Sequence, residues 1–178
     1  MSHDLFSSLD SFVAVSSVAS SLLVRDVAGE YRPAEADEVL LAAQRVLAGR
    51  MRGTEVLTSP AVVKDFLRVR LGNLPHEIFA VVHLDAQHRV LEYVEMFRGT
   101  VSQTSVYPRE VVKDALSRNS SALLLVHNHP SGSAEPSRAD EHLTQTLKSA
   151  AALIDVRVLD HLIVAGDSVL SMAEKGLM

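Results

Sequence analysis

Apolar residues recur along this chain with two different periods, and the period changes from segment to segment. Residues 34–52 and 60–72 carry apolar side chains at helical spacing, so one stripe of each segment is apolar. Residues 77–84 and 89–97 are strand-length runs joined by a tight connection. The pattern therefore predicts two helices followed by an antiparallel hairpin.

The second half of the chain alternates between the two kinds of segment. In order, we predict a helix over 108–118, a strand over 122–127, a helix over 137–153, a strand over 156–164 and a short strand near Val169. Alternation of this kind is typical of an α/β domain. The fold class we expect is therefore α/β, with a mixed sheet flanked by helices.

The N-terminal region has a different character. Residues 1–30 are rich in serine, alanine and valine with imperfect helical spacing, and turn-forming residues at 29–33 indicate a boundary. We predict a helical N-terminal extension over residues 1–54 and one domain over 55–178. The apolar stretch 12–24 is broken by serines and follows no basic leader, so we expect neither a signal peptide nor a membrane span.

Composition narrows the functional class. The chain has 178 residues with a formal net charge of −5, and its basic residues are scattered. A surface that follows nucleic-acid phosphates needs clustered Lys and Arg, so the sequence disfavours direct binding of nucleic acid. The chain has no cysteine, which rules out disulfides and thiolate metal sites and agrees with a reducing, cytoplasmic location.

The segment from His127 to Asp140 carries the candidate chemistry. His127 and His129 follow an apolar run of strand length, and residues two apart on a strand point to the same face. The Pro- and Gly-rich turn that follows lets Ser137 begin a helix and places Asp140 in its first turn, directed back toward the strand end. Two imidazoles and one carboxylate at this spacing predict a zinc site.

A zinc ion with three protein ligands is typical of a catalytic site, because the fourth tetrahedral position stays open to water. Zinc lowers the pKa of its bound water to about 7 and polarises a carbonyl under attack, so the chemistry implied is hydrolysis. A proton carrier is also needed. Glu77, at the head of a strand-like run, is the candidate general base, and Glu92 and Glu95 in the next run compete with it.

The arrangement resembles the JAMM (MPN+) metalloprotease signature, in which a distant Glu precedes His-x-His, seven residues, Ser, two residues and Asp. Several further segments are similar to the bacterial RadC family, namely Tyr107-Pro-Arg-Glu110, His127-Asn-His-Pro-Ser-Gly132, Pro136-Ser137 and Leu159-Asp-His161. The resemblance covers roughly residues 55–178.

The resemblance implies a cytidine-deaminase-like, three-layer JAB1/MPN architecture. It also implies a zinc ion held by His127, His129 and Asp140, with Glu77 as the general base. Ser137 is implied as the residue that hydrogen-bonds the developing oxyanion or orients the water.

These residues also have simpler structural interpretations. Ser137 and Asp140 have the form of a helix capping box. His161 lies in a largely buried run and is by default a hydrogen-bonded core histidine. Asp160, its neighbour, is a candidate to orient a ligand histidine through the second ring nitrogen.

We expect a zinc-dependent metallopeptidase or isopeptidase that hydrolyses an amide bond with a zinc-activated water. Its expected partner is a peptide or an isopeptide-linked protein, with no membrane partner, and the sequence leaves a homo-oligomer open. The alternatives are a non-catalytic protein-interaction MPN domain and a DNA-repair-associated protein.

The repair alternative comes from the RadC likeness. Full-length RadC proteins are expected to carry an N-terminal helix-hairpin-helix region that binds DNA, and residues 1–55 offer no recognisable glycine-containing hairpin. The chain therefore looks like a short form of the family. A zinc nucleobase deaminase needs a Pro-Cys-x-x-Cys segment, which a chain without cysteine cannot supply.

Overall fold

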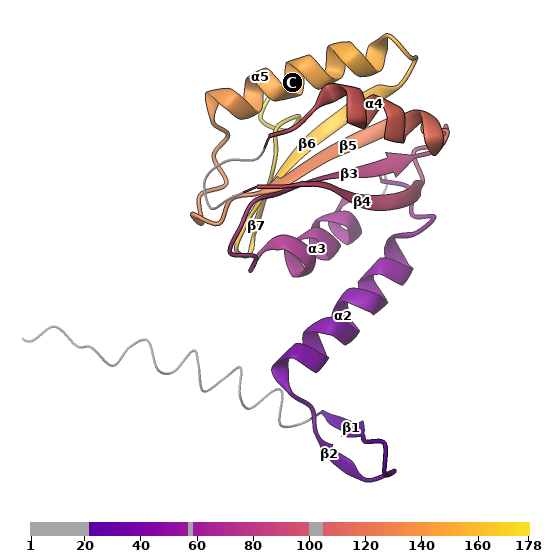
Figure 1. Ribbon diagram of the computed structural model, residues 1–178, viewed down its shortest axis with the longest axis vertical. Helices are drawn as coiled ribbons and strands as arrows, with labels where there is room; N and C mark the ends of the chain where they lie inside the picture. The colour runs from indigo at the N-terminus through magenta and orange to yellow at the C-terminus, as the bar shows by residue number, and fades with distance from the viewer. Residues whose placement is uncertain (1–21, 57–58, 100–104) are drawn as a thin grey trace, which may run out of the picture. The chain divides into compact units, whose positions relative to one another are not determined.

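The computed structural model describes residues 22–56, 59–99 and 105–178 (Figure 1). The chain divides into two compact units, Met1–Val46 and Leu47–Met178. The prediction for the first 21 residues lies outside the described residues, and the predicted domain limits stay a prediction.

The first unit contains a small antiparallel hairpin and the start of a helix. Strands β1 (Leu23–Arg25) and β2 (Tyr31–Pro33) pair with each other, and helix α2 (Ala36–Met51) follows. Asp26 shapes the turn between the strands, because its Oδ1 accepts hydrogen bonds from the backbone N–H groups of Ala28 and Glu30, each at 2.9 Å. The helical extension predicted here is thus only partly helical: three-residue strands with exposed ends are too short to leave an alternating pattern in the sequence.

The second unit is built on a five-stranded sheet in the order β4-β3-β5-β6-β7. Its strands are β3 (Ile78–Leu84), β4 (Val90–Arg98), β5 (Ala122–Asn128), β6 (Arg157–Ala165) and β7 (Ser168–Ser171). Neighbouring strands are antiparallel except β5 and β6, which are parallel, so the sheet is mixed as predicted. Every helix and strand predicted from residue 34 onward is present.

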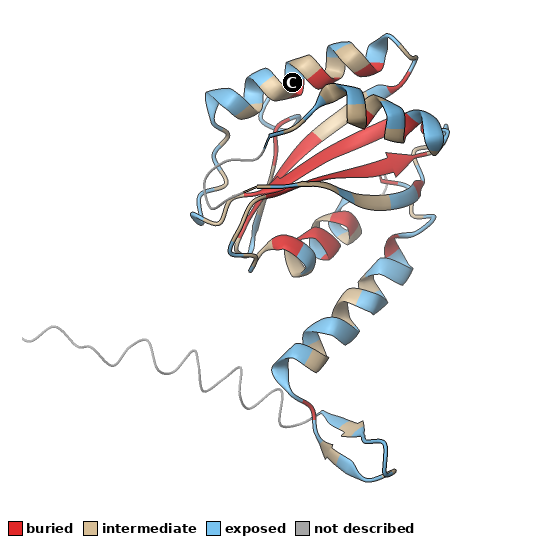
Figure 2. Cartoon of the chain, in the orientation of Figure 1, coloured by how far each residue is buried: buried red, intermediate tan, exposed pale blue. Residues whose placement is uncertain are grey.

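Helices cover both faces of this sheet (Figure 1). Helix α3 (Pro60–Leu71) packs on one face, while α4 (Pro108–Ser117) and α5 (Arg138–Ala152) pack on the other. All residues of β3 and β5 are buried, which gives the continuous buried stripe in Figure 2. The predicted three-layer α/β fold is confirmed.

Two hydrophobic clusters fill the space between the layers. Because side chains alternate along a strand, Ala80 and Val82 of β3 belong to the cluster on the α3 side, and Phe79 and Val81 belong to the cluster on the α4 and α5 side. The second cluster includes Leu123 and Leu125 of β5, the strand that leads into His127.

A β-bulge in β6 changes which of its residues face α5. Leu123 of β5 pairs with Val158, but the next residue, Leu124, pairs with Asp160, so Leu159 is an extra residue in the ladder. The alternation shifts by one at this point. His161 consequently lies on the face covered by α5, and Asp160 lies on the face covered by α3.

Within residues 22–56, 59–99 and 105–178, no helix is both long enough and apolar enough to span a bilayer.

Candidate metal centre

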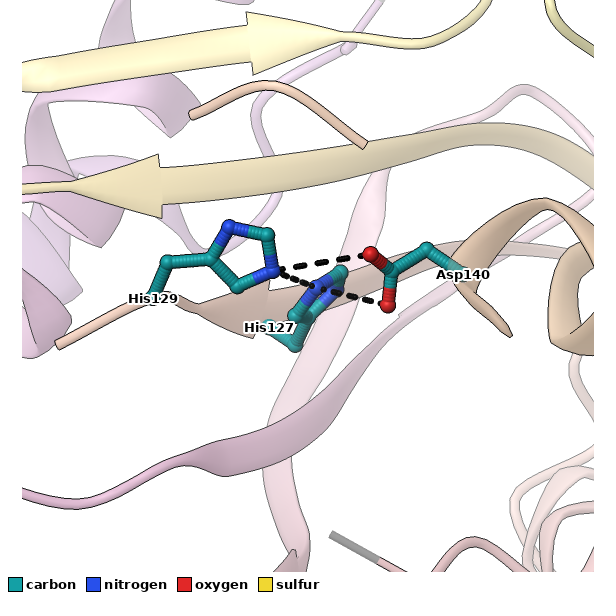
Figure 3. Close-up of side chains that lie close together, drawn as sticks. All are labelled: His127, His129 and Asp140. Atoms are coloured by element: carbon teal, nitrogen blue, oxygen red, sulfur yellow. Dashed lines mark hydrogen bonds and ion pairs between the residues drawn. The ribbon is translucent and has the colours of Figure 1, made fainter. Parts of the chain in front are cut away.

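His127, His129 and Asp140 converge at the end of β5 (Figure 3). The two Nε2 atoms of the histidines are 2.8 Å apart. Asp140 Oδ1 lies 3.2 Å from His127 Nε2, and its Oδ2 lies 3.5 Å from His129 Nε2. Three groups that commonly bind metals therefore present their atoms to one point, all within 4.8 Å of one another.

The two histidines are positioned by β5 and its continuation, and Asp140 is positioned by α5. His127 is in the buried interior of β5, and the backbone N–H of His129 continues the ladder by donating to Val164 O of β6 at 2.8 Å. A turn then reverses the chain: Gly132 N donates to His129 O at 3.1 Å, with Gly132 at φ +82, a conformation that suits glycine. Asp140 enters from the first turn of α5.

Ser137 orients the Asp140 carboxylate. Its backbone N–H and its Oγ both donate to Asp140 Oδ2 at 2.7 Å, and Asp140 N donates to Ser137 Oγ at 3.2 Å. The capping box is therefore present, and it holds Oδ2 while Oδ1 faces His127. The structure brings Ser137 to the site through Asp140.

The second ring nitrogen of each histidine also has a partner. His129 Nδ1 lies 2.7 Å from the backbone oxygen of Ser133, and His127 Nδ1 lies 2.8 Å from Nε2 of the fully buried His161. A carbonyl can only accept, so His129 carries its proton on Nδ1 and presents the Nε2 lone pair to the site.

The prediction that Asp160 orients a ligand histidine is wrong. The Asp160 carboxylate accepts hydrogen bonds from the backbone of His161 and Ala173 and from Ser171 Oγ, and it lines a cavity on the α3 side of the sheet. The bulge in β6 is the physical reason, because it exchanges the faces of Asp160 and His161.

The charges of the site favour a cation at its centre. The hydrogen bond to Asp140 is the main cause that raises the pKa of His129, and the Ser133 carbonyl and the Glu77 charge add to it. Burial alone would raise the pKa of Asp140, but the neighbouring imidazoles of His127 and His129 and the hydroxyl of Ser137 outweigh burial and hold this pKa well below its usual range. Burial also lowers the pKa of His161 well below its usual value.

The donor set fits a divalent metal ion. Two imidazoles and one carboxylate are ligands that zinc accepts, and three protein ligands leave a further position open. The side chains of His129 and Asp140 each keep 15% of their surface exposed, so the point where the donors meet is reachable from solvent.

Glu77 immediately precedes β3, and the β3–β5 register pairs Phe79 with His127, so Glu77 lies at the same end of the sheet as the three donors. Its charge is close enough to His129 to contribute to the raised pKa of that imidazole. The competing candidates are engaged elsewhere, because Glu92 pairs with Arg118 and Glu95 pairs with Arg70 at 2.8 Å.

Asn128 fixes the backbone on both sides of Glu77. The Asn128 side chain is buried, its Oδ1 accepts from Ile78 N at 2.7 Å, and its Nδ2 donates to His76 O at 3.0 Å. One amide therefore joins the start of β3 to the residue between the two histidines. No local sequence pattern indicates this contact, because it joins residues 50 positions apart.

Most of the second unit matches a known protein family. A family model described as a RadC-like JAB domain matches residues 57–177, which is more than half of the chain. The chain belongs to the RadC family. The matched range contains the five-stranded sheet and every residue named above as a candidate ligand or catalytic group.

Curated relatives agree with this assignment. A UPF0758 protein of Methylibium petroleiphilum is 56% identical over 167 residues, which are 89% of this chain and 75% of that protein. A UPF0758 protein of Leptothrix cholodnii is 57% identical over 150 residues, 84% of this chain and 68% of that protein. A third, from Nitrosomonas eutropha, is 50% identical over 150 residues.

Proposed function

We propose that this RadC-family chain is a zinc-dependent hydrolase of amide bonds, a metallopeptidase or isopeptidase. The proposal rests on one observation above all: His127, His129 and Asp140 place their donor atoms within 4.8 Å of one another. Zinc held by these three residues would supply an activated water and polarise the substrate carbonyl.

Glu77 is the proposed proton carrier. Its carboxylate takes a proton from the attacking water and passes it to the nitrogen of the leaving amine, so that the amide bond breaks into an acid and a neutral amine. Its position at the head of β3, held from both sides by Asn128, supports this role.

Ser137 has two proposed contributions. It orients Asp140 through its backbone N–H and its Oγ, and this contact supports a role in holding the ligand. During the reaction its single hydroxyl proton turns from Asp140 Oδ2 to the developing oxyanion or the water, while the Ser137 backbone N–H keeps its hydrogen bond to Asp140.

The proposed substrate class is a peptide or a protein joined through an isopeptide bond. The net charge of −5 and the scattered basic residues favour such a substrate over nucleic acid. The lack of cysteine fits a reducing cytoplasm, where we propose that the reaction takes place.

The test is hydrolysis of fluorogenic peptide and isopeptide substrates by the zinc-loaded full chain. Glu77→Gln should keep zinc and lose turnover, by about 100-fold or more if general acid and base catalysis is removed. Glu95→Gln is the matched control, since it changes a nearby carboxylate that is paired with Arg70.

Two results would contradict this account. Full activity in Glu77→Gln would show that another group moves the proton. A parent protein that binds zinc and cleaves no peptide or isopeptide would instead support the protein-interaction alternative.

A further inference from the structure

A chain of hydrogen bonds runs through the protein interior from α5 to His127. Thr144 and His161 are both fully buried. Thr144 Oγ1 lies 2.6 Å from the backbone oxygen of Asp140 and 2.6 Å from His161 Nδ1, and His161 Nε2 lies 2.8 Å from His127 Nδ1. This Thr144–His161 chain ends on a candidate ligand and begins on the carbonyl of another.

The direction of each hydrogen bond follows from the first one. The Asp140 carbonyl can only accept, so the single hydroxyl proton of Thr144 is directed to it. Met172 Sδ competes only weakly, at 3.7 Å and as a poor acceptor. Thr144 Oγ1 must then accept from His161, which places the His161 proton on Nδ1.

The same logic sets the tautomer of His127. A neutral imidazole has one N–H and one acceptor nitrogen, so His161 with its proton on Nδ1 presents a lone pair at Nε2. That lone pair accepts from His127 Nδ1–H. His127 is left with an unprotonated Nε2, the atom that faces His129 and Asp140.

If the hydrogen bonds ran in the opposite direction, His127 could not bind a metal through Nε2. If Thr144 donated to His161, then His161 would donate to His127, and the His127 proton would lie on Nε2 at the centre of the site.

We propose that Thr144 and His161 are positioning residues that hold His127 in the tautomer able to bind a metal. Asp140 acts twice in this arrangement, because its carboxylate faces the metal position and its backbone carbonyl fixes the direction of the chain. The inference rests on the proposed function only where it assumes a bound metal. The His127 tautomer itself is set by the protein without a metal. Partners of this kind typically change metal affinity by about 10–100-fold.

The first test is nitrogen NMR of the histidine rings in the metal-free full chain, well above the ordinary imidazole pKa of about 6.5. The parent should show His127 protonated on Nδ1. Thr144→Val, which keeps the shape and removes the hydroxyl, should move the His127 proton toward Nε2, and Thr144→Ser should restore the parent spectrum. A parent spectrum with the proton on Nε2, or no change in Thr144→Val, would overturn the proposal.

The second test is zinc affinity by competition with a chelator. His161→Leu should weaken zinc binding by about 10–100-fold, and His161→Gln, whose side-chain oxygen can accept from His127, should weaken it less. The control is His83→Leu, which removes another fully buried histidine, near the far end of β3.

The outcomes separate the inference from the proposed function. Equal weakening in His83→Leu and His161→Leu would mean that any loss of packing loosens the site, and it would overturn the positioning role. A parent that shows the expected His127 tautomer but binds no zinc would contradict the proposed function and support the tautomer assignment.

Discussion

The sheet holds two fully buried histidines that lead toward opposite ends of it: His161, in the middle of β6, contacts His127 near the end of β5, and His83 lies near the other end, at the close of β3. His83 Nδ1 lies 2.8 Å from Ser120 Oγ, and its Nε2 lies 2.8 Å from Asp114 Oδ2. Asp114 is in turn paired with Arg118 at 3.0 Å. The network around His83 therefore contains both a carboxylate and a permanent cation.

The network around His161 ends differently. It leads through His127 to Asp140, and among the residues that the structure describes Asp140 forms ion pairs only with His127 and His129. The carboxylate near His83 is balanced by an arginine, whereas the carboxylate near His161 faces imidazole nitrogens. The difference teaches that the protein's own charges balance the carboxylate at one end, whereas the carboxylate at the other end lacks an arginine partner among the described residues, which supports the metal ion proposed there.

The largest expected effect comes from removing the carboxylate at each end. Asp140→Asn should weaken zinc binding by more than the roughly 100-fold seen for residues that only support a ligand, because it removes a ligand charge. Asp114→Asn should leave zinc affinity unchanged. Competition titration with a chelator measures both, and equal affinity in Asp140→Asn and the parent would remove the distinction between the two ends.

The two ends of β3 can also be compared through the side chains that hold their backbone, Asn128 at the start and Asp85 after the end. Asn128→Ala leaves the backbone groups of His76 and Ile78 without this partner, which should cost about 1–3 kcal/mol of stability and reduce hydrolysis while zinc remains bound. Asp85→Ala is the matched control, because the Asp85 carboxylate accepts hydrogen bonds from the backbone N–H groups of Gln87 and Arg89 at the other end of β3.

Chemical denaturation and turnover, measured on the same zinc-loaded samples, distinguish the two variants. Asp85→Ala should lose stability and keep turnover. Full turnover in Asn128→Ala would show that Glu77 does not depend on this contact.

The buried, neutral state of His83 should make the folded protein less stable as the pH falls. Burial lowers the pKa of His83 and Arg118 lowers it further, while Asp114 and Glu92 oppose them. The unfolded chain takes up this proton near pH 6.5 and the folded chain resists it, so stability falls as the pH drops below about 6.5, by at most about 1.4 kcal/mol per pH unit.

His83→Leu should have a shallower loss of stability over the same pH range. The measurement is urea unfolding of metal-free protein across that range, with the other histidines present in both proteins. Identical slopes in the parent and the variant would contradict a neutral, buried His83.

The smallest expected effect compares two serines that begin helices. Ser137 accepts from Asp140 N and holds the Asp140 carboxylate, whereas Ser59 at the start of α3 makes no side-chain capping hydrogen bond. Ser137→Ala should cost about 1 kcal/mol of stability and Ser59→Ala much less, as thermal unfolding can show. Equal losses would indicate that the cap of α5 does not depend on the Ser137 side chain.

Much of the fold could be predicted because its signals are local. The periods of the apolar residues predicted the helices and strands from residue 34 onward, and the spacing of His127, His129 and Asp140 predicted their convergence. A strand places residues two apart on one face, and a helix start directs its first turn backward.

The features that sequence reasoning missed depend on irregular or distant contacts. Strict alternation from Val158 would place Asp160 beside the ligands, but the bulge at Leu159 places His161 there instead. The Asn128 contact with Ile78 joins two strands, and no local pattern indicates it. The β1–β2 hairpin is too short to produce a period.

The central claim is that the open end of the sheet is a metal centre, and metal content tests it most directly. Plasma mass spectrometry of purified, untagged protein should find about one zinc per chain, with little zinc in His127→Ala and Asp140→Ala and a full complement in His83→Leu. A parent without zinc even after reconstitution, or ligand variants that retain it, would contradict the account.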